Sequence, residues 1–166
     1  MENAVRKANV AGLRRNEEKW GKELIEAGWT LLPSTILERQ QALGLDPMDI
    51  NILLHLIRHW WYADRLPYPS KRVIAECIGI DESTVRKRIQ RLEVAGLVKR
   101  IARKHPIFGR DTNAYDLAGL VAEATPYAIE AIETRNRDKK AKAERRTRKR
   151  AIFKVVTNED HPKHPK

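Results

Sequence analysis

The chain has 166 residues, a length typical of one domain with extensions. Its 33 Lys and Arg against 22 Asp and Glu give a formal net charge of +11, which favours an anionic partner, nucleic acid before a membrane surface. The N-terminus is not signal-like, apolar runs are far shorter than the roughly 20 residues of a transmembrane helix, and Cys77 is the single cysteine, which excludes an intramolecular disulfide framework and a multi-thiolate metal site.

These features predict a soluble, cytoplasmic, nucleoid-associated protein. Residues 1–19 are charged and poor in apolar side chains, and we expect a flexible arm. Residues 20–45 are more apolar and predict a helical N-terminal extension packed on the main domain. In it, Ser34 is expected to cap a short helix that carries Ile36, Leu37 and Leu43 and ends at Gly44.

A longer amphipathic helix is predicted from Asp46, an N-cap residue followed by Pro47 at the first helical position. Its apolar residues recur at intervals of three or four, which indicates one buried stripe. The stripe comprises Ile50, Leu53, Leu54, Ile57 and Trp61, so Trp61 is expected in the core.

Two short helices follow. The first is expected to begin at Ser70, to bury Val73, Ile74, Cys77 and Ile78, and to end at Gly79. The second is expected to be capped by Asp81, to bury Val85, Ile89 and Leu92, and to end at Gly96. Ala75, Gly79 and Val85 stand at the spacing of a helix-turn-helix, which needs a small residue, a turn glycine and an apolar residue there.

Residues 97–117 predict a basic β-hairpin. Apolar and basic residues alternate in LVKRIARK, turn residues follow in HPIFGRDTN, and AYDL is expected to form the returning strand. The predicted fold class is therefore mainly α, a winged helix-turn-helix at 46–117 with a three-helix core and a β-hairpin wing. It carries the N-terminal helical extension and a long basic C-terminal extension.

The C-terminal extension is expected to contain a helix within residues 118–150, with Thr125 and Pro126 as a further N-cap and first-turn pair, and a tail at 151–166. Residues 135–150 hold ten Lys or Arg against Asp138 and Glu144, a block expected to extend or stay disordered in isolation. It is either a non-specific phosphate clamp or a solubilising tail.

The segment PSKRVIAECIGIDESTVRKRIQRLEVAGLVKRIAR resembles the winged helix-turn-helix of bacterial GntR and MarR-type regulators and of phage and plasmid replication-initiation and regulatory proteins. The shared features are the Pro-Ser opening, the Ala before a Gly-Ile turn, the Ser-Thr-Val start of the second helix and RLEVAGLVKR at the wing. The resemblance covers about residues 46–117 and implies DNA contacts by Arg72 and Arg86.

From the helical wheel, the outward arc of the second helix carries side chains suited to a major groove, where Arg reads guanine and Gln reads adenine. Residues near helix starts are suited to phosphates. A basic wing tip can enter a minor groove or straddle phosphates, although charge on an edge hairpin also protects it from strand pairing. The candidate DNA-binding residues are Ser70, Lys71, Arg72, Ser83, Thr84, Arg86, Lys87, Gln90, Arg91, Arg103, Lys104, His105 and Arg110.

No catalytic motif is present, and we expect no enzyme activity, no cofactor and no metal site. His55 and His59 have the spacing of a metal pair, but no further ligand type converges on them in sequence, so two surface or core-edge histidines are the better interpretation. Tyr115 with Asp116, or Tyr62 with Asp64, lacks the His or Arg set of a relaxase or recombinase.

The expected function is sequence-specific binding of double-stranded DNA as a transcriptional regulator, with a helix at 81–95 in the major groove and the wing on flanking DNA. The alternatives are a plasmid- or phage-type replication-initiation factor that binds origin DNA, and a winged-helix protein-interaction adaptor. One such domain covers few base pairs, so we expect a homodimer, with residues 20–44 or the C-terminal segment as interface. No small-molecule effector is evident.

Overall fold

The computed structural model describes residues 12, 14–105, 109–110 and 112–147. The chain divides into two units, Met1–Ala128 and Ile129–Lys166. The expected tail at 151–166 and most of the expected arm at 1–19 lie outside the described residues, but residues 14–20 are helical. No described helix combines the length and apolar composition needed to cross a membrane.

The N-terminal extension is helical as predicted, but it contains two short helices, α2 (Lys22–Glu26) and α3 (Ser34–Glu38), where the sequence predicted one. Its packing differs from the prediction, because α2 buries no residue and α3 buries Ile36 alone. The expected cap is also wrong: Pro33 occupies the N-cap position and no side chain caps α3. The predicted helix end at Gly44 is wrong as well, because α3 ends at Glu38 and turns lead from there to Gly44, which has φ 67°.

Helix α4 (Pro47–Arg58) begins as predicted, with Pro47 in the first turn. Its start is a capping box: the Asp49 amide donates to Asp46 Oδ1 (2.9 Å), and the Asp46 amide donates to Asp49 Oδ2 (3.1 Å). The prediction that Trp61 lies in the core is wrong, because α4 ends at Arg58 and the indole of Trp61 is 66% exposed. Trp60 packs against the core instead.

Helices α5 (Lys71–Ile78) and α6 (Glu82–Val94) follow, and both predicted starts are confirmed. Ser70 Oγ accepts from the Val73 amide at 3.1 Å, whereas Asp81 occupies the N-cap of α6 without a side-chain hydrogen bond. The buried stripe of α6 (Val85, Ile89, Leu92) is confirmed.

The predicted apolar face of α5 is partly wrong. Ile74 is buried and Ile78 packs at the edge of the core, but Val73 and Cys77 are exposed. The small Ala75 is buried in their place, where α5 lies against α6. The helix is short and crosses its neighbour closely, so one narrow stripe is enough to pack it.

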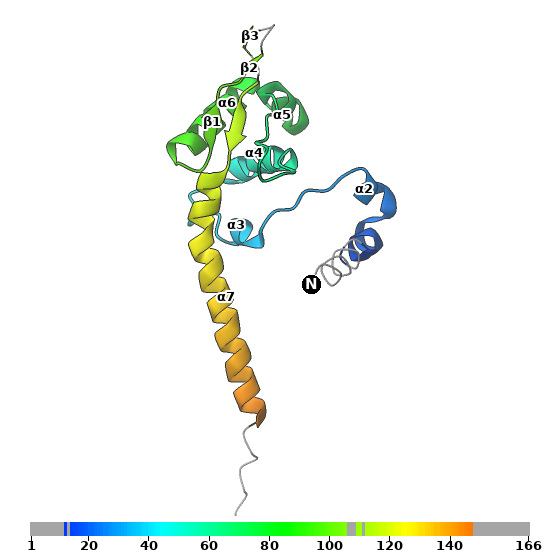
Figure 1. Ribbon diagram of the computed structural model, residues 1–166, viewed down its shortest axis with the longest axis vertical. Helices are drawn as coiled ribbons and strands as arrows, with labels where there is room; N and C mark the ends of the chain where they lie inside the picture. Colours follow the sequence, from blue (N-terminus) through cyan, green and yellow to red (C-terminus); the bar gives the residue numbers. More distant parts are fainter. Residues whose placement is uncertain (1–11, 13, 106–108, 111, 148–166) are drawn as a thin grey trace, which may run out of the picture. The chain divides into compact units, whose positions relative to one another are not determined.

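The wing is confirmed as an antiparallel hairpin. Strand β1 (Lys99–Ile101) pairs with β4 (Ala114–Asp116), with Arg100 opposite Tyr115. Beyond them β2 (Lys104–His105) pairs with β3 (Gly109–Arg110), and these strands continue the hairpin away from the helices (Figure 1).

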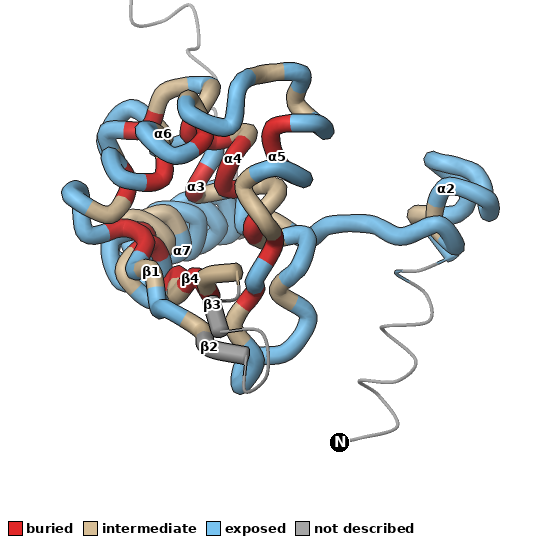
Figure 2. The backbone as a smooth tube through the Cα atoms, turned by 90° about the horizontal axis from the view of Figure 1, so that it is seen from above, coloured by how far each residue is buried: buried red, intermediate tan, exposed pale blue. Residues whose placement is uncertain are grey.

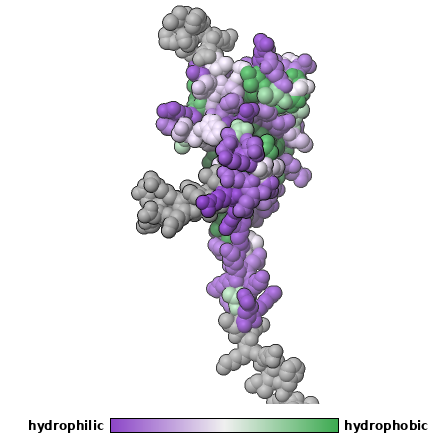
Figure 3. Space-filling model, turned by 90° about the vertical axis from the view of Figure 1, so that its right-hand side faces the viewer, coloured by the Kyte–Doolittle hydropathy of each residue, from purple (hydrophilic) through white to green (hydrophobic). Residues whose placement is uncertain are grey.

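Helix α7 (Ala118–Thr147) is one continuous helix with Pro126 inside it (Figure 1). The predicted new helix start at Thr125 and Pro126 is therefore wrong. Asp116 Oδ1 accepts from the Ala118 amide at 2.8 Å at the actual start, and the Thr125 hydroxyl donates to the Val121 carbonyl at 2.6 Å just before the proline. Residues 135–147, part of the block expected to extend or stay disordered in isolation, are helical, and residues 135–146 are exposed. Hydrophilic side chains cover the C-terminal part of α7 (Figure 3).

The core lies between α4, α5, α6, the stem of the wing and the first turns of α7. Figure 2 shows the buried backbone gathered there. Its fully or nearly fully buried side chains include Ile52, Leu53, Leu56, Ile74, Val85, Ile89, Leu92, Val98, Tyr115, Leu117 and Leu120. This core holds the turn between α5 and α6 and the stem of the wing in fixed positions.

Candidate nucleic-acid interface

The turn between α5 and α6 depends on Gly79, which has φ 78° and ψ 38°. Its amide and that of Ile80 both donate to the Ala75 carbonyl, at 2.9 and 3.1 Å, which closes the end of α5. A Cβ at this position would meet nothing within 4 Å, so the left-handed backbone, rather than space, calls for glycine. The chain then enters α6 in a helix-turn-helix arrangement.

The outward face of α6 presents four exposed polar side chains, Ser83, Arg86, Lys87 and Gln90. They lie opposite the buried stripe, where the helical wheel predicts them. Arg86 has one acidic neighbour, Glu82, whose Oε1 is 4.0 Å from the guanidinium. A pair this long and exposed contributes little to stability, so Arg86 is available to an anionic ligand.

Two other arginines of α6 bind carboxylates of α4. Arg88 pairs with Asp46, and its Nη1 also lies 3.6 Å from Asp49 Oδ1. Arg91 pairs with Asp49 through Nη1, and its Nη2 donates to the Gly44 carbonyl at 2.9 Å. The Asp49 side chain is fully buried, so these pairs fix α6 against the start of α4. Of the candidate DNA-binding residues on α6, Arg91 is the one whose charge is already neutralised.

The first turn of α5 carries three further candidates. Ser70 is half-buried at the cap, Lys71 is half-buried and Arg72 is exposed. Arg72 Nε donates to Glu76 Oε1 at 2.8 Å, and this hydrogen bond raises the pKa of the guanidinium. Thr84, by contrast, is half-buried in α6, and its amide donates to the Asp81 carbonyl at 3.0 Å.

The stem of the wing is tied to the end of α6. Arg100 Nε donates to Glu93 Oε2 at 2.7 Å, and the Arg100 amide donates to Glu93 Oε1 at 3.3 Å. These bonds hold the pKa of the Glu93 carboxyl below its usual value. Arg103 donates to Thr112 Oγ1 at 3.4 Å across the hairpin. For Lys104, His105 and Arg110 the backbone of β2 and β3 is described, and their side chains lie outside the described residues.

A hollow of about 680 Å³ lies where α5, α6 and the wing meet. Its basic lining comes from Lys71, Arg72, Arg86 and Arg100, and the rest of the lining is Pro69, Ser70, Glu82, Thr112, Asn113 and Tyr115. Burial raises the pKa of Tyr115, partly offset by Arg100 and reinforced by Glu82. The hollow therefore brings Lys71 and Arg86 together with hydroxyl and amide donors, a combination suited to a phosphate group. The other two cations, Arg72 and Arg100, are bonded to Glu76 and Glu93.

Sequence reasoning missed Thr112, Asn113 and Tyr115 in this lining. They reach it because β4 returns beside β1 in the register that places Arg100 opposite Tyr115. The strand pattern was visible in the sequence, but the register of a hairpin depends on its turn. Asp46 and Asp49 were also missed as partners of α6, since the ion pairs join residues 42 apart in the chain.

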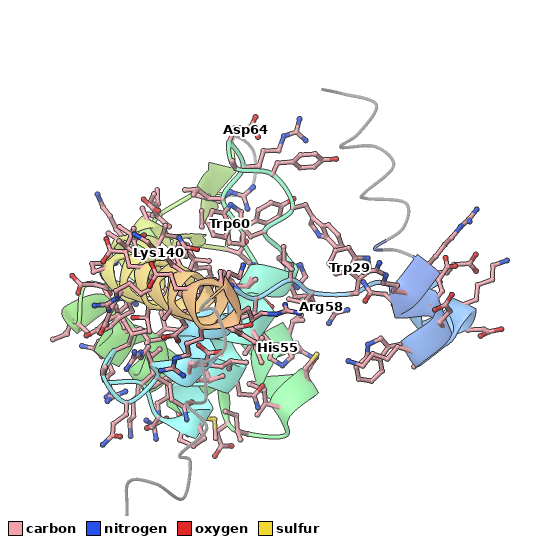
Figure 4. All side chains as sticks on the ribbon, turned by 90° about the horizontal axis from the view of Figure 1, so that it is seen from below. Trp29, His55, Arg58, Trp60, Asp64 and Lys140 are labelled. Carbon is pink, nitrogen blue, oxygen red and sulfur yellow. The ribbon has the colours of Figure 1, made fainter. Side chains whose placement is uncertain are left out.

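His55 and His59 do not form a metal site among the described residues, where no group of three His, Cys, Asp or Glu side chains converges. Burial lowers the pKa of both imidazoles, and the Arg58 guanidinium lowers it further. Figure 4 shows His55 and Arg58 on α4.

Residues 43–98 match the family described as "Helix-turn-helix domain". This range contains α4, α5 and α6 and ends just before β1. With the hairpin of β1 and β4 after this range, the chain has a winged helix-turn-helix fold, a class of DNA-binding fold. No curated protein sequence matches the chain.

The chain is also similar to solved structures of low sequence identity. The N-terminal domain of the DnaD protein from Geobacillus kaustophilus HTA426 is 18% identical, with a TM-score of 0.49, over 69% of this chain and 93% of that one. The YusO protein from Bacillus subtilis is 19% identical, with a TM-score of 0.39, over 89% of this chain and 94% of that one. The transcriptional regulator PA3341 is 18% identical, with a TM-score of 0.35, over 87% of this chain and 91% of that one.

Proposed function

We propose that the protein binds a specific site in double-stranded DNA and regulates transcription there. The observation that carries this proposal is the division of charge on α6. Arg88 and Arg91 are used to hold the helix in place, whereas Arg86 and Lys87 project outward with Ser83 and Gln90. A helix with a neutralised flank and a basic, hydrogen-bonding outer face suits the major groove.

In this proposal α6 lies in the major groove and the wing lies on the flanking DNA. Arg86 pairs with guanine, and Gln90 with adenine. Ser70, Lys71 and Arg72 contact the backbone, and a phosphate enters the hollow between the first turn of α5 and the wing. Arg103, Lys104, His105 and Arg110 contact DNA through the wing.

We also propose that the protein acts as a homodimer on a two-fold site, because one winged domain reads few base pairs. Both candidate interfaces expose apolar side chains. Trp20, Leu24, Trp29 and Leu31 are exposed in the N-terminal extension, and Val121, Ile129 and Ile132 are exposed on α7.

Selection of binding sites from randomised duplexes and from genomic DNA, with the full chain and with a chain that lacks residues 135–166, tests the proposal. The expected result is one enriched motif with two-fold symmetry, next to a promoter, that survives the deletion. The deletion removes many Lys and Arg, and we expect it to weaken non-specific binding and to flatten its dependence on salt. Sites repeated within a replication origin would assign an initiator instead, and no binding even at low salt would assign a protein-interaction adaptor.

A further inference from the structure

The loop between α4 and α5 exposes three large aromatic side chains. We name residues 59–69 the aromatic loop. Its Trp61, Tyr62 and Tyr68 are 66%, 62% and 57% exposed, although Trp60 beside them packs on the core. Exposed rings gathered in one segment of a small domain indicate a binding surface.

Arginine side chains lie over two of these rings. The guanidinium of Arg65 is 5.2 Å from the centroid of Tyr62, and that of Arg103 is 4.1 Å from the centroid of Tyr68. A backbone bridge joins Tyr62 and Arg65 and fixes the turn between them. The aromatic loop therefore presents ring faces together with positive charge.

The aromatic loop continues directly into the candidate nucleic-acid interface. The Tyr115 amide of β4 donates to the Pro67 carbonyl at 2.8 Å, so the end of the loop lies against the stem of the wing. Pro69, at its end, lines the hollow between α5 and the wing. In Figure 4 Asp64 marks the outer tip of the loop, and Trp60 lies nearer the helices.

The charge of the segment favours a nucleic acid over a protein as its ligand. Residues 58–72 contain four Lys or Arg and a single acid, Asp64. Trp, Tyr and Arg are also frequent in protein interfaces, but continuity with the basic hollow adds to the attraction for phosphate. Flat aromatic rings beside arginines are the arrangement on which unpaired bases stack, with little dependence on sequence.

We propose that the aromatic loop binds unpaired bases of single-stranded DNA beside the duplex held by α6 and the wing. Trp61 and Tyr62 provide the stacking faces, and Arg65 and Arg103 neutralise the phosphates of that strand. This activity is additional to the reading of duplex DNA, and a helix-turn-helix domain does not require it.

The test is fluorescence anisotropy of the full-length protein with a labelled thymidine oligonucleotide and, separately, with its selected duplex. We expect the double variant W61A/Y62A to lose about tenfold or more in affinity for the oligonucleotide, a stacking loss of the usual size, and to keep its affinity for the duplex. The variant W61F/Y62F retains rings and is expected to bind the oligonucleotide nearly as well as the wild type. The matched control is W20A, which removes an exposed indole outside the aromatic loop and should leave the affinity for the oligonucleotide unchanged.

A second variant separates this proposal from the proposed function. Q90A is expected to weaken duplex binding and to leave oligonucleotide binding unchanged, because Gln90 is uncharged, lies on the outward face of α6 and does not line the hollow. The proposal is overturned if the wild type does not bind the oligonucleotide at low salt, or if W61A/Y62A binds it as the wild type does. A change in oligomeric state of W61A/Y62A with unchanged oligonucleotide affinity would also overturn it and would make the aromatic loop a protein-contact surface.

Discussion

Arg88 and Arg91 are chemically the same as Arg86, yet they serve the fold. Their guanidinium groups meet Asp46 and Asp49 at the first turn of α4, where Asp49 also completes the capping box. Burial of the Asp49 carboxylate is tolerable because two cations and the helix start stabilise its charge. The Asp49 carboxylate thus joins the start of α4 to α6.

We predict that D49N destabilises the protein by about 2 kcal/mol, less than the full cost of an unpaired buried charge, because Arg88 and Arg91 reach water. Urea unfolding followed by circular dichroism measures the loss. The control is D64N, an exposed aspartate in the aromatic loop, which should unfold like the wild type. Equal midpoints for D49N and D64N would show that the ion pairs do not hold α6.

At the scale of elements, backbone contacts constrain the junction of α6, the wing and α7 tightly. Gly96 ends α6 with φ 74°, and the Leu120 amide of α7 donates to the Leu97 carbonyl at 2.9 Å. A Cβ on Gly119 would lie 1.9 Å from the Gly96 carbonyl oxygen. The first turn of α7 therefore packs directly on the backbone that leads into the wing.

G119A should lower the free energy of unfolding by about 2 kcal/mol or more, since backbone must move to relieve the overlap. G12A is the matched control, because this helical glycine has nothing within 4 Å of an added Cβ. Thermal unfolding of both variants distinguishes them. A G119A protein as stable as the wild type would mean that α7 does not start against Gly96.

The link between α6 and β1 predicts a dependence of stability on pH. Arg100 lowers the pKa of Glu93 below its ordinary value of 4.5, so the pair stabilises the fold fully above that value and loses its contribution as the pH falls through the lowered pKa. The pair is partly exposed and is worth about 1 kcal/mol or less.

E93Q should therefore be slightly less stable than the wild type at neutral pH and should converge with it in acid. Urea midpoints measured from neutral pH down to the acid limit of folding give the comparison. A constant difference across the whole range would assign the effect to packing rather than to charge.

The local signals in the sequence predicted these elements well. Asp46, Ser70, Gly79 and Gly96 mark helix ends that depend on neighbouring residues alone, and all four are confirmed. The predictions of a buried Trp61 and of a helix start at Pro126 are wrong because tertiary contacts determine where α4 ends and where α7 begins. Periodicity extends the stripe of α4 to Trp61 although the helix ends three residues earlier, and the start of α7 is fixed by Asp116 and the Gly96 turn.

In the candidate site, too, the sequence predicts the features that depend on local geometry and misses those that depend on tertiary contacts. The outward set of α6 follows from the 100° step of a helix, and its exposure is confirmed for Ser83, Arg86, Lys87 and Gln90. The sequence does not predict that an ion pair neutralises Arg91, because this pair depends on the start of α4 lying beside the middle of α6. No rule of sequence spacing supplies a contact between residues that far apart.

For the molecule as a whole, the positive charge divides into groups with separate roles. Part of it stabilises the junction of α4 and α6, part faces outward from α6 and the hollow, and part lies on the exposed helical residues 135–146. Only the outward set is proposed to read DNA sequence. The arginines that pair with Asp46 and Asp49 should then not contribute to the salt dependence of DNA binding.

The measurement that tests this most directly is the affinity for the selected duplex as a function of salt concentration, for wild type, R86Q and R91Q, under conditions where circular dichroism shows each protein folded. Each lost cation that neutralises a DNA phosphate lowers the slope of log affinity against log salt by about 0.9. We predict that R86Q weakens binding, lowers the slope and relaxes the preferred sequence, while R91Q keeps the slope and the preference of the wild type. An unchanged R86Q, or an R91Q that loses as much slope as R86Q, would contradict the proposed division of charge on α6.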